Sequence, residues 1–154
     1  SHISEGPQLL EMGRTMSSCA SCESKAALDF WAKFTHRLGR MSAQNSLDGP
    51  QLAMALEVCA CWARRCGVRS ELRGTWAHMI RSVGGRLSEL DVLGQLPLTA
   101  VTSVARDAAV CGEPQYRLAA SLGFRIEKQT RELATEDMID LIGAAGKLGG
   151  WACR

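Results

Sequence analysis

Arginine residues are concentrated in the middle of the chain, where their chemistry suits the binding of a polyanion. Residues 31–86 hold nine basic and three acidic residues, a net charge of +6, whereas residues 1–30 and 87–154 each carry −2. The planar guanidinium group of arginine pairs well with phosphate oxygens and base edges. Clustered arginines are the electrostatic footprint expected of a nucleic-acid-binding surface. We predict RNA contact by eight arginines of this segment: Arg37, Arg40, Arg64, Arg65, Arg69, Arg73, Arg81 and Arg86.

The arginine cluster also has two explanations that do not involve RNA, and the sequence does not decide between them and RNA binding. Arginines near the end of a helix stabilise the negative end of its macrodipole, so part of the cluster would be structural. A GC-biased genome also favours arginine codons, and arginine outnumbers lysine by fourteen to four in this chain. Trp62 and Trp76 lie within the same segment, where they would either stack on unpaired bases or fill the core.

Two cysteine pairs have spacings that raise the question of a zinc site. Cys19 and Cys22 form a CxxC pair, which is half of a common zinc site. Cys59 and Cys61 would have to complete it, but residues two apart on a helix point about 200° apart. Because this geometry strains a tetrahedral site, we expect no zinc. A redox CxxC normally follows a strand, and no strand is predicted before Cys19.

The cysteines predict free thiols rather than a disulfide framework, because the seven are odd in number and irregular in spacing. We therefore expect a reducing compartment and mostly buried thiols. Cys66 and Cys111 each precede a glycine that is predicted to end a helix, so both are expected to be small buried packing residues.

The sequence shows no pattern typical of an active site. The three histidines, His2, His36 and His78, are scattered, without an HExxH motif or a carboxylate at a fixed offset. The glycine pairs at 84–85 and 149–150 are predicted to end helices and follow no strand, so neither is a phosphate loop. We expect a binding protein without catalytic residues, cofactor, metal or small-molecule substrate.

Composition is that of an ordinary globular domain. Hydrophobic residues make up 46% and charged residues 22% of the 154 residues, enough for one domain with a core. No run approaches eighteen consecutive apolar residues and no secretory signal is recognisable, so no membrane insertion is expected. The chain begins at Ser1, which fits either removal of a targeting peptide or a cloning boundary.

Apolar residues recur at helical spacing along most of the chain, without the alternation typical of strands. Residues 1–20, with Gly6, Pro7 and Gly13, are predicted to be an N-terminal arm, extended or with a short helix near residues 9–12. Residues 21–154 are predicted to form a single helical-repeat domain. Its helices are expected at residues 23–38, 50–67, 71–83, 97–111, from 114 onward and at 135–149, with a short segment at 87–93. Ser70 is expected to cap one of them, and Gly39, Gly67, Gly84–Gly85 and Gly112 to end four.

Three of the predicted helices resemble one another: residues 50–67, 97–112 and 135–149. Each begins with a proline or a capping residue and carries an alanine four residues before its final glycine. These glycines are 45 and 37 residues apart, a period typical of arrays of helical hairpins. One hairpin cannot bury its own apolar face, so neighbouring hairpins must stack. The sequence predicts an all-α fold, a short right-handed stack of helical hairpins like an α-solenoid, with about six to seven helices.

The last of these units carries a pattern found in a known group of repeat proteins. Residues 133–138 read LATEDM and residues 144–149 read AAGKLG. This pattern resembles the octotricopeptide and heptatricopeptide repeat proteins of organelles, a group similar to the FAST-kinase-like and RAP-domain proteins. The likeness covers about residues 47–150, although residues 97–112 lack Lys-Leu-Gly and no RAP domain is visible. It implies hairpins that bind RNA in mitochondria or plastids, in some members as ribosomal components.

Our hypothesis is a non-catalytic protein that binds structured RNA, such as ribosomal RNA, beside neighbouring protein subunits of a mitochondrial ribosome. The expected compartment is the mitochondrial matrix, with a plastid as the second choice. Three hairpins are few for a protein that reads about one base per repeat, which favours a component of a larger assembly. The alternative is a scaffold subunit of a mitochondrial ribosomal or respiratory complex without RNA contact. It predicts exposed apolar contacts at Trp31, Trp62, Trp76 and Trp151.

Overall fold

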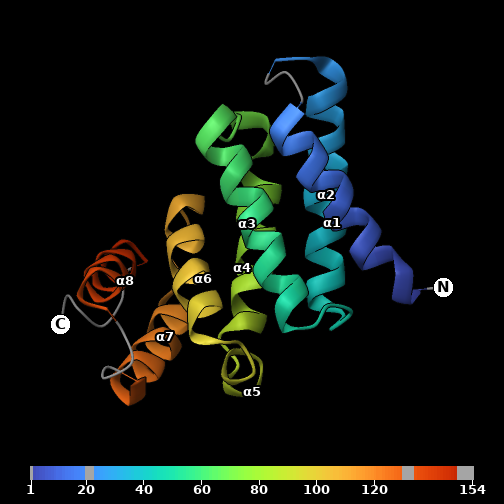
Figure 1. Ribbon diagram of the computed structural model, residues 1–154. Helices are drawn as coiled ribbons and strands as arrows, with labels where there is room; N and C mark the ends of the chain where they lie inside the picture. Colours follow the sequence, from blue (N-terminus) through green and yellow to red (C-terminus); the bar gives the residue numbers. More distant parts are fainter. Residues whose placement is uncertain (1, 20–22, 130–133, 149–154) are drawn as a thin grey trace.

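Helices make up almost all of the described structure (Figure 1). The computed structural model describes residues 2–19, 23–129 and 134–148, except for the side chains of residues 2–4, 19 and 145. Within these residues there are eight α helices, one 3₁₀ helix and no strand, so the predicted all-α class is confirmed. The α helices are α1 (His2–Cys19), α2 (Lys25–Ala43), α3 (Gly49–Cys66), α4 (Arg73–Leu87), α5 (Leu90–Gly94), α6 (Leu98–Cys111), α7 (Tyr116–Gln129) and α8 (Thr135–Lys147).

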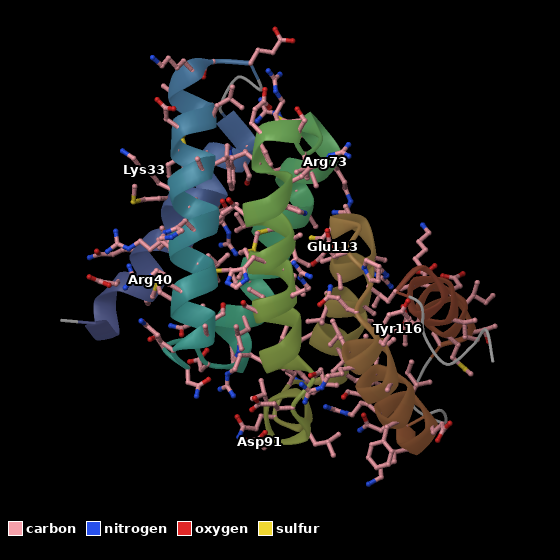
Figure 2. The ribbon with its side chains drawn as sticks, turned by 180° about the vertical axis from the view of Figure 1, so that it is seen from behind. Lys33, Arg40, Arg73, Asp91, Glu113 and Tyr116 are labelled. Atoms are coloured by element: carbon pink, nitrogen blue, oxygen red, sulfur yellow. The ribbon has the colours of Figure 1, made fainter. Side chains whose placement is uncertain are left out.

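The helices form two layers, which is how stacked hairpins bury their apolar faces. One layer contains α1, α3, α6 and α8 in that order, each packing on the next (Figure 1). The other contains α2, α4 and α7, with α2 packed along α4 and α4 in contact with α7 (Figure 2). The short helix α5 contacts α4 and α7. The three helices with similar sequences, α3, α6 and α8, are therefore consecutive members of one layer.

A stack of buried tryptophans joins the two layers. Trp31 of α2 and Trp62 of α3 have ring centroids 4.8 Å apart, and Trp62 lies 5.7 Å from Trp76 of α4. The indole Nε1 of Trp76 donates a hydrogen bond of 3.1 Å to the backbone carbonyl of Cys111 in α6. Four helices thus meet at one set of side chains.

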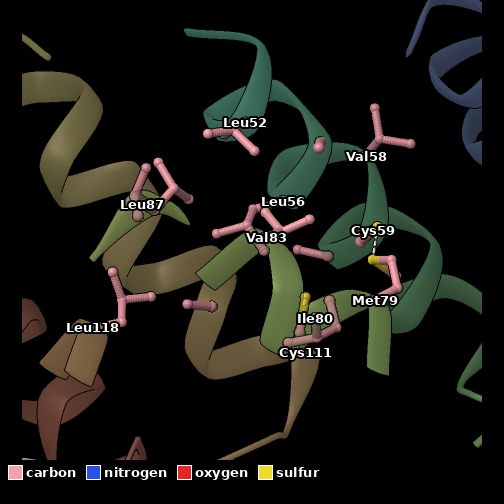
Figure 3. Packing of buried hydrophobic residues seen from close by; sticks show 14 of the residues in the cluster. Leu52, Leu56, Val58, Cys59, Met79, Ile80, Val83, Leu87, Cys111 and Leu118 are labelled. Atoms are coloured by element: carbon pink, nitrogen blue, oxygen red, sulfur yellow. Dashed lines mark hydrogen bonds between the residues drawn. The ribbon is translucent and has the colours of Figure 1, made fainter. Parts of the chain in front are cut away.

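Aliphatic side chains continue this core toward α7 (Figure 3). Leu52 and Leu56 of α3 lie among Val83 and Leu87 of α4 and Leu118 of α7, and all five are buried. Each such side chain contributes about 1.5–3 kcal/mol when fully removed from water. The same cluster extends from α1 to α8, so one core joins the described helices.

Residues 2–19, predicted to be part of an arm that is extended or has a short helix near residues 9–12, instead form the 18-residue helix α1, which packs on α3 and α2. Gly6 and Gly13 argue against a helix on propensity, yet both lie within α1. A Cβ added at Gly13 would lie 2.5 Å from Cε2 of Phe34, and one at Gly6 would lie 2.9 Å from Cδ2 of Leu47. The two glycines are seven residues apart and so share one helix face, where they let α1 approach its neighbours closely.

Two predicted helix ends, at Gly39 and at Gly84–Gly85, are also wrong. Both helices continue past these glycines, α2 to residue 43 and α4 to residue 87. A Cβ at Gly39 would lie 3.4 Å from the Cα of Met79, so this glycine allows close packing of α2 on α4. Gly67 and Gly112 do end α3 and α6 as predicted, with φ values of 71° and 83° that favour glycine.

Helix starts follow the sequence signals more closely than helix ends do. The Asp48 side chain accepts a 2.9 Å hydrogen bond from the backbone N–H of Gln51, whose side-chain oxygen accepts one of 3.0 Å in return. This capping box begins α3, and Pro97 occupies the N-cap of α6. Ser70 makes no capping hydrogen bond; it begins the 3₁₀ helix Ser70–Leu72 that leads into α4.

Candidate nucleic-acid interface

The outer surface of the second layer carries most of the exposed basic side chains (Figure 2). Among the described side chains, the exposed residues of α2, α4 and α7 include eight lysines and arginines and two acids, Asp29 and Glu127. Those of α1, α3, α6 and α8 include five basic and four acidic residues. We call the outer surface of α2, α4 and α7 the α2–α4–α7 face. Its basic residues are Lys25, Lys33, Arg37, Arg40, Arg73, Arg81, Arg117 and Lys128.

The basic residues of α2 lie on one helical stripe, since Lys33, Arg37 and Arg40 are four and three residues apart. They line a groove of about 430 Å³ between α1 and α2, together with His36 and Glu5. Arg37 is ion-paired with Glu5 at 3.3 Å between Nη2 and Oε1. Lys33 and Arg40 have no carboxylate within 4 Å among the described residues. Both cations therefore remain available to an external anion.

The helices α4 and α7 extend this surface. A Cβ at Gly39 of α2 would lie 3.7 Å from Cδ2 of His78, so the exposed side of α4 lies directly beside that of α2. Arg73 and Arg81 are exposed on α4, and Arg117 is exposed in the first turn of α7. No described carboxylate forms an ion pair with these three arginines. Basic side chains thus cover three neighbouring helices.

Arg64 and Arg65 belong to α3, in the other layer, where they make structural contacts. Arg64 is ion-paired with the buried Asp107 of α6 at 3.5 Å. The Nη1 of Arg65 donates a 2.9 Å hydrogen bond to the backbone carbonyl of Ser17 near the end of α1. Burial raises the pKa of Asp107, and the charge of Arg64 opposes that shift. These two predicted site residues therefore connect α3 to α6 and α1 and do not reach the α2–α4–α7 face.

The remaining predicted arginines divide between surface and structural positions. Arg86 is half-buried and ion-paired with Glu89, and its Nε has no hydrogen-bond partner among the described residues. Arg69, in the connection between α3 and α4, lies 4.0 Å from the carboxylate of Glu71. Of the eight predicted arginines, the structure brings four together on the α2–α4–α7 face: Arg37, Arg40, Arg73 and Arg81.

Four basic residues of this face were not among the predicted site residues: Lys25, Lys33, Arg117 and Lys128. Lys33 is detectable in the sequence, because it continues the helical spacing of Arg37 and Arg40. Arg117 lies outside the arginine-rich segment. Only the packing of α7 beside α4 brings it close to the other cations.

The described tryptophans do not serve either predicted surface role. Trp62 and Trp76 are 2% and 3% exposed, so stacking on RNA bases is excluded for both and the core alternative is confirmed. Trp31 is buried as well, which also removes these three as contacts for a protein partner. Trp151, the fourth candidate for such contacts, lies outside the described residues.

The described cysteines follow the prediction of buried thiols only in part. Cys59 and Cys111 are free and buried, and Sγ of Cys59 lies 3.9 Å from Sδ of Met79 (Figure 3). The prediction is wrong for Cys66, which is disulfide-bonded. The bonded Cys66 therefore departs from the free thiols expected from the odd number and irregular spacing of the cysteines.

Only two of the four cysteines considered for a zinc site, Cys59 and Cys61, have side chains within the described part of the chain. It contains no group of three or more His, Cys, Asp or Glu side chains that could hold a metal ion. Cys59 is buried and Cys61 is half-buried. The side chains of Cys19 and Cys22 lie outside the described residues.

Iodoacetamide at pH 8 should leave Cys59 and Cys111 of the folded protein unmodified. Burial raises the pKa of Cys59 well above its usual value and that of Cys111 to about 12, and only the thiolate reacts. Both groups therefore stay protonated until the pH passes well above 8. Peptide mass spectrometry should detect both labels after unfolding in guanidinium, while the half-buried Cys61 serves as the internal control. Labelling of Cys59 as fast as Cys61 in the native protein would contradict its burial.

None of the described helices combines the length and the apolar character needed to cross a bilayer. The candidate interface is instead a solvent-exposed, charged surface on three helices. Comparison of the chain with protein-family models, with curated proteins and with solved structures gave no match.

Proposed function

We propose that this protein is a non-catalytic helical-repeat protein that binds structured RNA through the α2–α4–α7 face. The charge difference between the two layers is the observation that carries the proposal: eight basic against two acidic residues on this face, five against four on the other layer. Stacking of hairpins needs apolar contacts between layers and does not require such a separation of charge. A surface of one sign attracts a polyanion and speeds its association.

Contact with phosphates, rather than with base edges, suits the side chains of this face. Lys33, Arg40, Arg73 and Arg81 are exposed and have no described carboxylate as a competing partner. Lysine and arginine side chains that neutralise phosphates release counterions, which gives binding that depends strongly on salt. Such contacts position an RNA without reading its sequence, as expected for a fixed structural RNA.

Membership of an organellar ribosome is part of the proposal, and the resemblance of residues 133–149 to organellar repeat proteins supports it. Axes of packed helices are about 8–10 Å apart, so three helices give a face roughly 20 Å wide. A surface of this size suits a fixed subunit of a mitochondrial or plastid ribosome better than a protein that reads a long RNA sequence.

A scaffold function without RNA is the second candidate, supported by apolar side chains exposed at both ends of the stack. Met12 of α1 is 55% exposed, and Ile139 and Ile142 of α8 are 64% and 45% exposed. No described helix covers these residues beyond α1 or α8. Protein subunits that dock end-on would bury them.

Fluorescence anisotropy with a labelled RNA hairpin at several salt concentrations tests the first candidate. If about four phosphates are neutralised, log K should fall with log salt with a slope of about −3 to −4. The triple variant Lys33→Gln/Arg40→Gln/Arg81→Gln should bind about tenfold more weakly and flatten the slope by about 2 to 3.

The matched control is Arg14→Gln/Arg106→Gln/Lys147→Gln, which removes the same charge from exposed positions of the other layer. We expect its affinity to stay within about twofold of the native protein, because screening limits the reach of exposed charges. Equal weakening by both triple variants would reject the α2–α4–α7 face as the binding surface. Absence of RNA binding at low salt, with the fold intact by circular dichroism, would favour the scaffold.

A further inference from the structure

A pocket between α4 and α7 combines several groups that recognise phosphate. It has a volume of about 250 Å³, and we call it the α4–α7 pocket. Arg81 and the backbone at Gly84–Gly85 line it from α4, and Gln115, Tyr116 and Arg117 line it from the start of α7. Arg81 and Arg117 also belong to the α2–α4–α7 face, so the pocket opens within the proposed RNA-binding surface.

The N-terminus of α7 provides hydrogen-bond donors at this pocket. The first backbone hydrogen bond of the helix runs from the N–H of Ala119 to the carbonyl of Gln115 at 2.9 Å. The N–H groups of Tyr116, Arg117 and Leu118 therefore have no partner within the helix. No described side chain accepts a hydrogen bond from them. Free N–H groups and the positive end of the macrodipole together favour an anion.

Gln115 is an independent indication of a ligand. Its side chain is 7% exposed, and neither Nε2 nor Oε1 has a hydrogen-bond partner among the described residues. The amide lies against α4, because a Cβ added at Gly84 would lie 1.5 Å from its Oε1. A shorter Asn or Asp at this position would cap α7, whereas the longer glutamine packs its amide against Gly84 of α4, in the wall of the pocket. A buried amide without a partner is unfavourable, and a ligand oxygen that accepts from Nε2 relieves it.

Tyr116 adds an aromatic surface beside these donors (Figure 2). Its side chain is 62% exposed, whereas the described tryptophans are buried. An exposed aromatic ring among arginines is typical of sites for single-stranded nucleic acid, because bases stack on the ring while the cations hold the backbone.

We propose that the α4–α7 pocket binds one unpaired nucleotide of the RNA. Its phosphate lies at the N-terminus of α7 between Arg81 and Arg117, and its base stacks on Tyr116. This inference rests on the proposed RNA-binding function and refines it: the α2–α4–α7 face holds phosphates of a structured RNA, and the pocket accepts a bulged or looped-out residue. Such residues are the usual targets of specific RNA recognition, because their bases are free to stack on protein.

A ¹H–¹⁵N NMR titration of the whole chain with uridine 5′-monophosphate tests the pocket without RNA. We expect shifts at the backbone amides of Tyr116, Arg117 and Leu118 and at the side-chain amide of Gln115. Inorganic phosphate should shift the backbone amides at higher concentration, because it lacks the base. Tyr116→Ala should lower the affinity for the nucleotide to that for phosphate. Tyr116→Phe should keep the native affinity for the nucleotide. Absence of shifts at these amides would overturn the inference whether or not the chain binds RNA.

Binding to two RNA hairpins, one fully paired and one with a single bulged nucleotide, tests the pocket in the complex. Tyr116→Ala should weaken binding of the bulged hairpin about tenfold and leave the paired hairpin within about twofold. Arg117→Gln should weaken the bulged hairpin more than Lys128→Gln, which removes the same charge from the same helix. Equal losses for these two variants would overturn the pocket and leave the general RNA-binding face intact. Shifts with the nucleotide but no binding of either hairpin would support the pocket and contradict the proposed function.

Discussion

Replacement of Trp62 by alanine is expected to lower the free energy of unfolding by about 3–5 kcal/mol. Trp62 is 2% exposed and lies between Trp31 and Trp76, with ring centroids 4.8 and 5.7 Å away. Its removal leaves a cavity where α2, α3 and α4 meet. Close packing of α2 on α4 at Gly39 prevents these helices from closing that cavity. Since a domain of this size is stable by about 5–15 kcal/mol, the variant would lose a large part of its stability.

Urea unfolding followed by the helical circular dichroism signal measures this loss. Phe124→Ala is the matched control, because this aromatic side chain is 47% exposed on α7 and should change stability by about 0.5 kcal/mol or less. If the alanine variant does not fold, Trp62→Phe keeps the test open, with an expected loss of about 1–2 kcal/mol from the smaller ring. A loss below about 1 kcal/mol for Trp62→Ala would show that the tryptophan stack does not hold the layers together.

Local signals in the sequence predict where the helices of this fold begin, but not how glycines are used within them. Asp48 and Pro97 act through hydrogen bonds or dihedral angles within their own turn, so their effect is visible in a short window. Gly39 and Gly67 look alike in sequence. Gly67 ends α3 with a φ of 71°, whereas Gly39 lies inside α2 because Met79 of another helix packs against it. That second role depends on contacts between distant segments, which a local pattern does not contain.

In the candidate interface, too, local patterns predict some residues, whereas only the packing of distant segments identifies the others. The stripe of Lys33, Arg37 and Arg40 follows from helical spacing and is readable in sequence. Arg64, by contrast, belongs to the same arginine-rich segment but is ion-paired with Asp107, 43 positions later in the chain. Arg117 lies beyond that segment and joins the face because α7 packs beside α4. Net charge along the chain therefore identifies the region of the interface, and only the two-layer packing selects its members.

Replacement of Gly13 by valine is expected to lower the free energy of unfolding by about 2–3 kcal/mol, mainly by displacing α1. Even the Cβ of alanine would lie 2.5 Å from Cε2 and 2.8 Å from Cζ of Phe34, and 3.0 Å from Cγ1 of Val58. The aromatic ring has little room to move, since Phe34 is 1% exposed and lies 5.0 Å from Trp31. Gly13→Ala should therefore lose about 1–2 kcal/mol, although alanine gains about 1 kcal/mol over glycine in helix propensity.

Gly143→Ala is the control that separates the steric cost of an added Cβ from the gain in helix propensity. Gly143 is exposed within α8, and a Cβ added there meets no atom within 4 Å, so only the propensity gain of about 0.5–1 kcal/mol should appear. The two alanine variants are thus expected to shift stability in opposite directions. Hydrogen exchange should also be faster in α1 of the Gly13 variants while the amides of α6 keep their protection. Stabilisation by both substitutions would mean that α1 does not need close contact with Phe34, and the first hairpin of the stack would then have to bury its apolar face in another way.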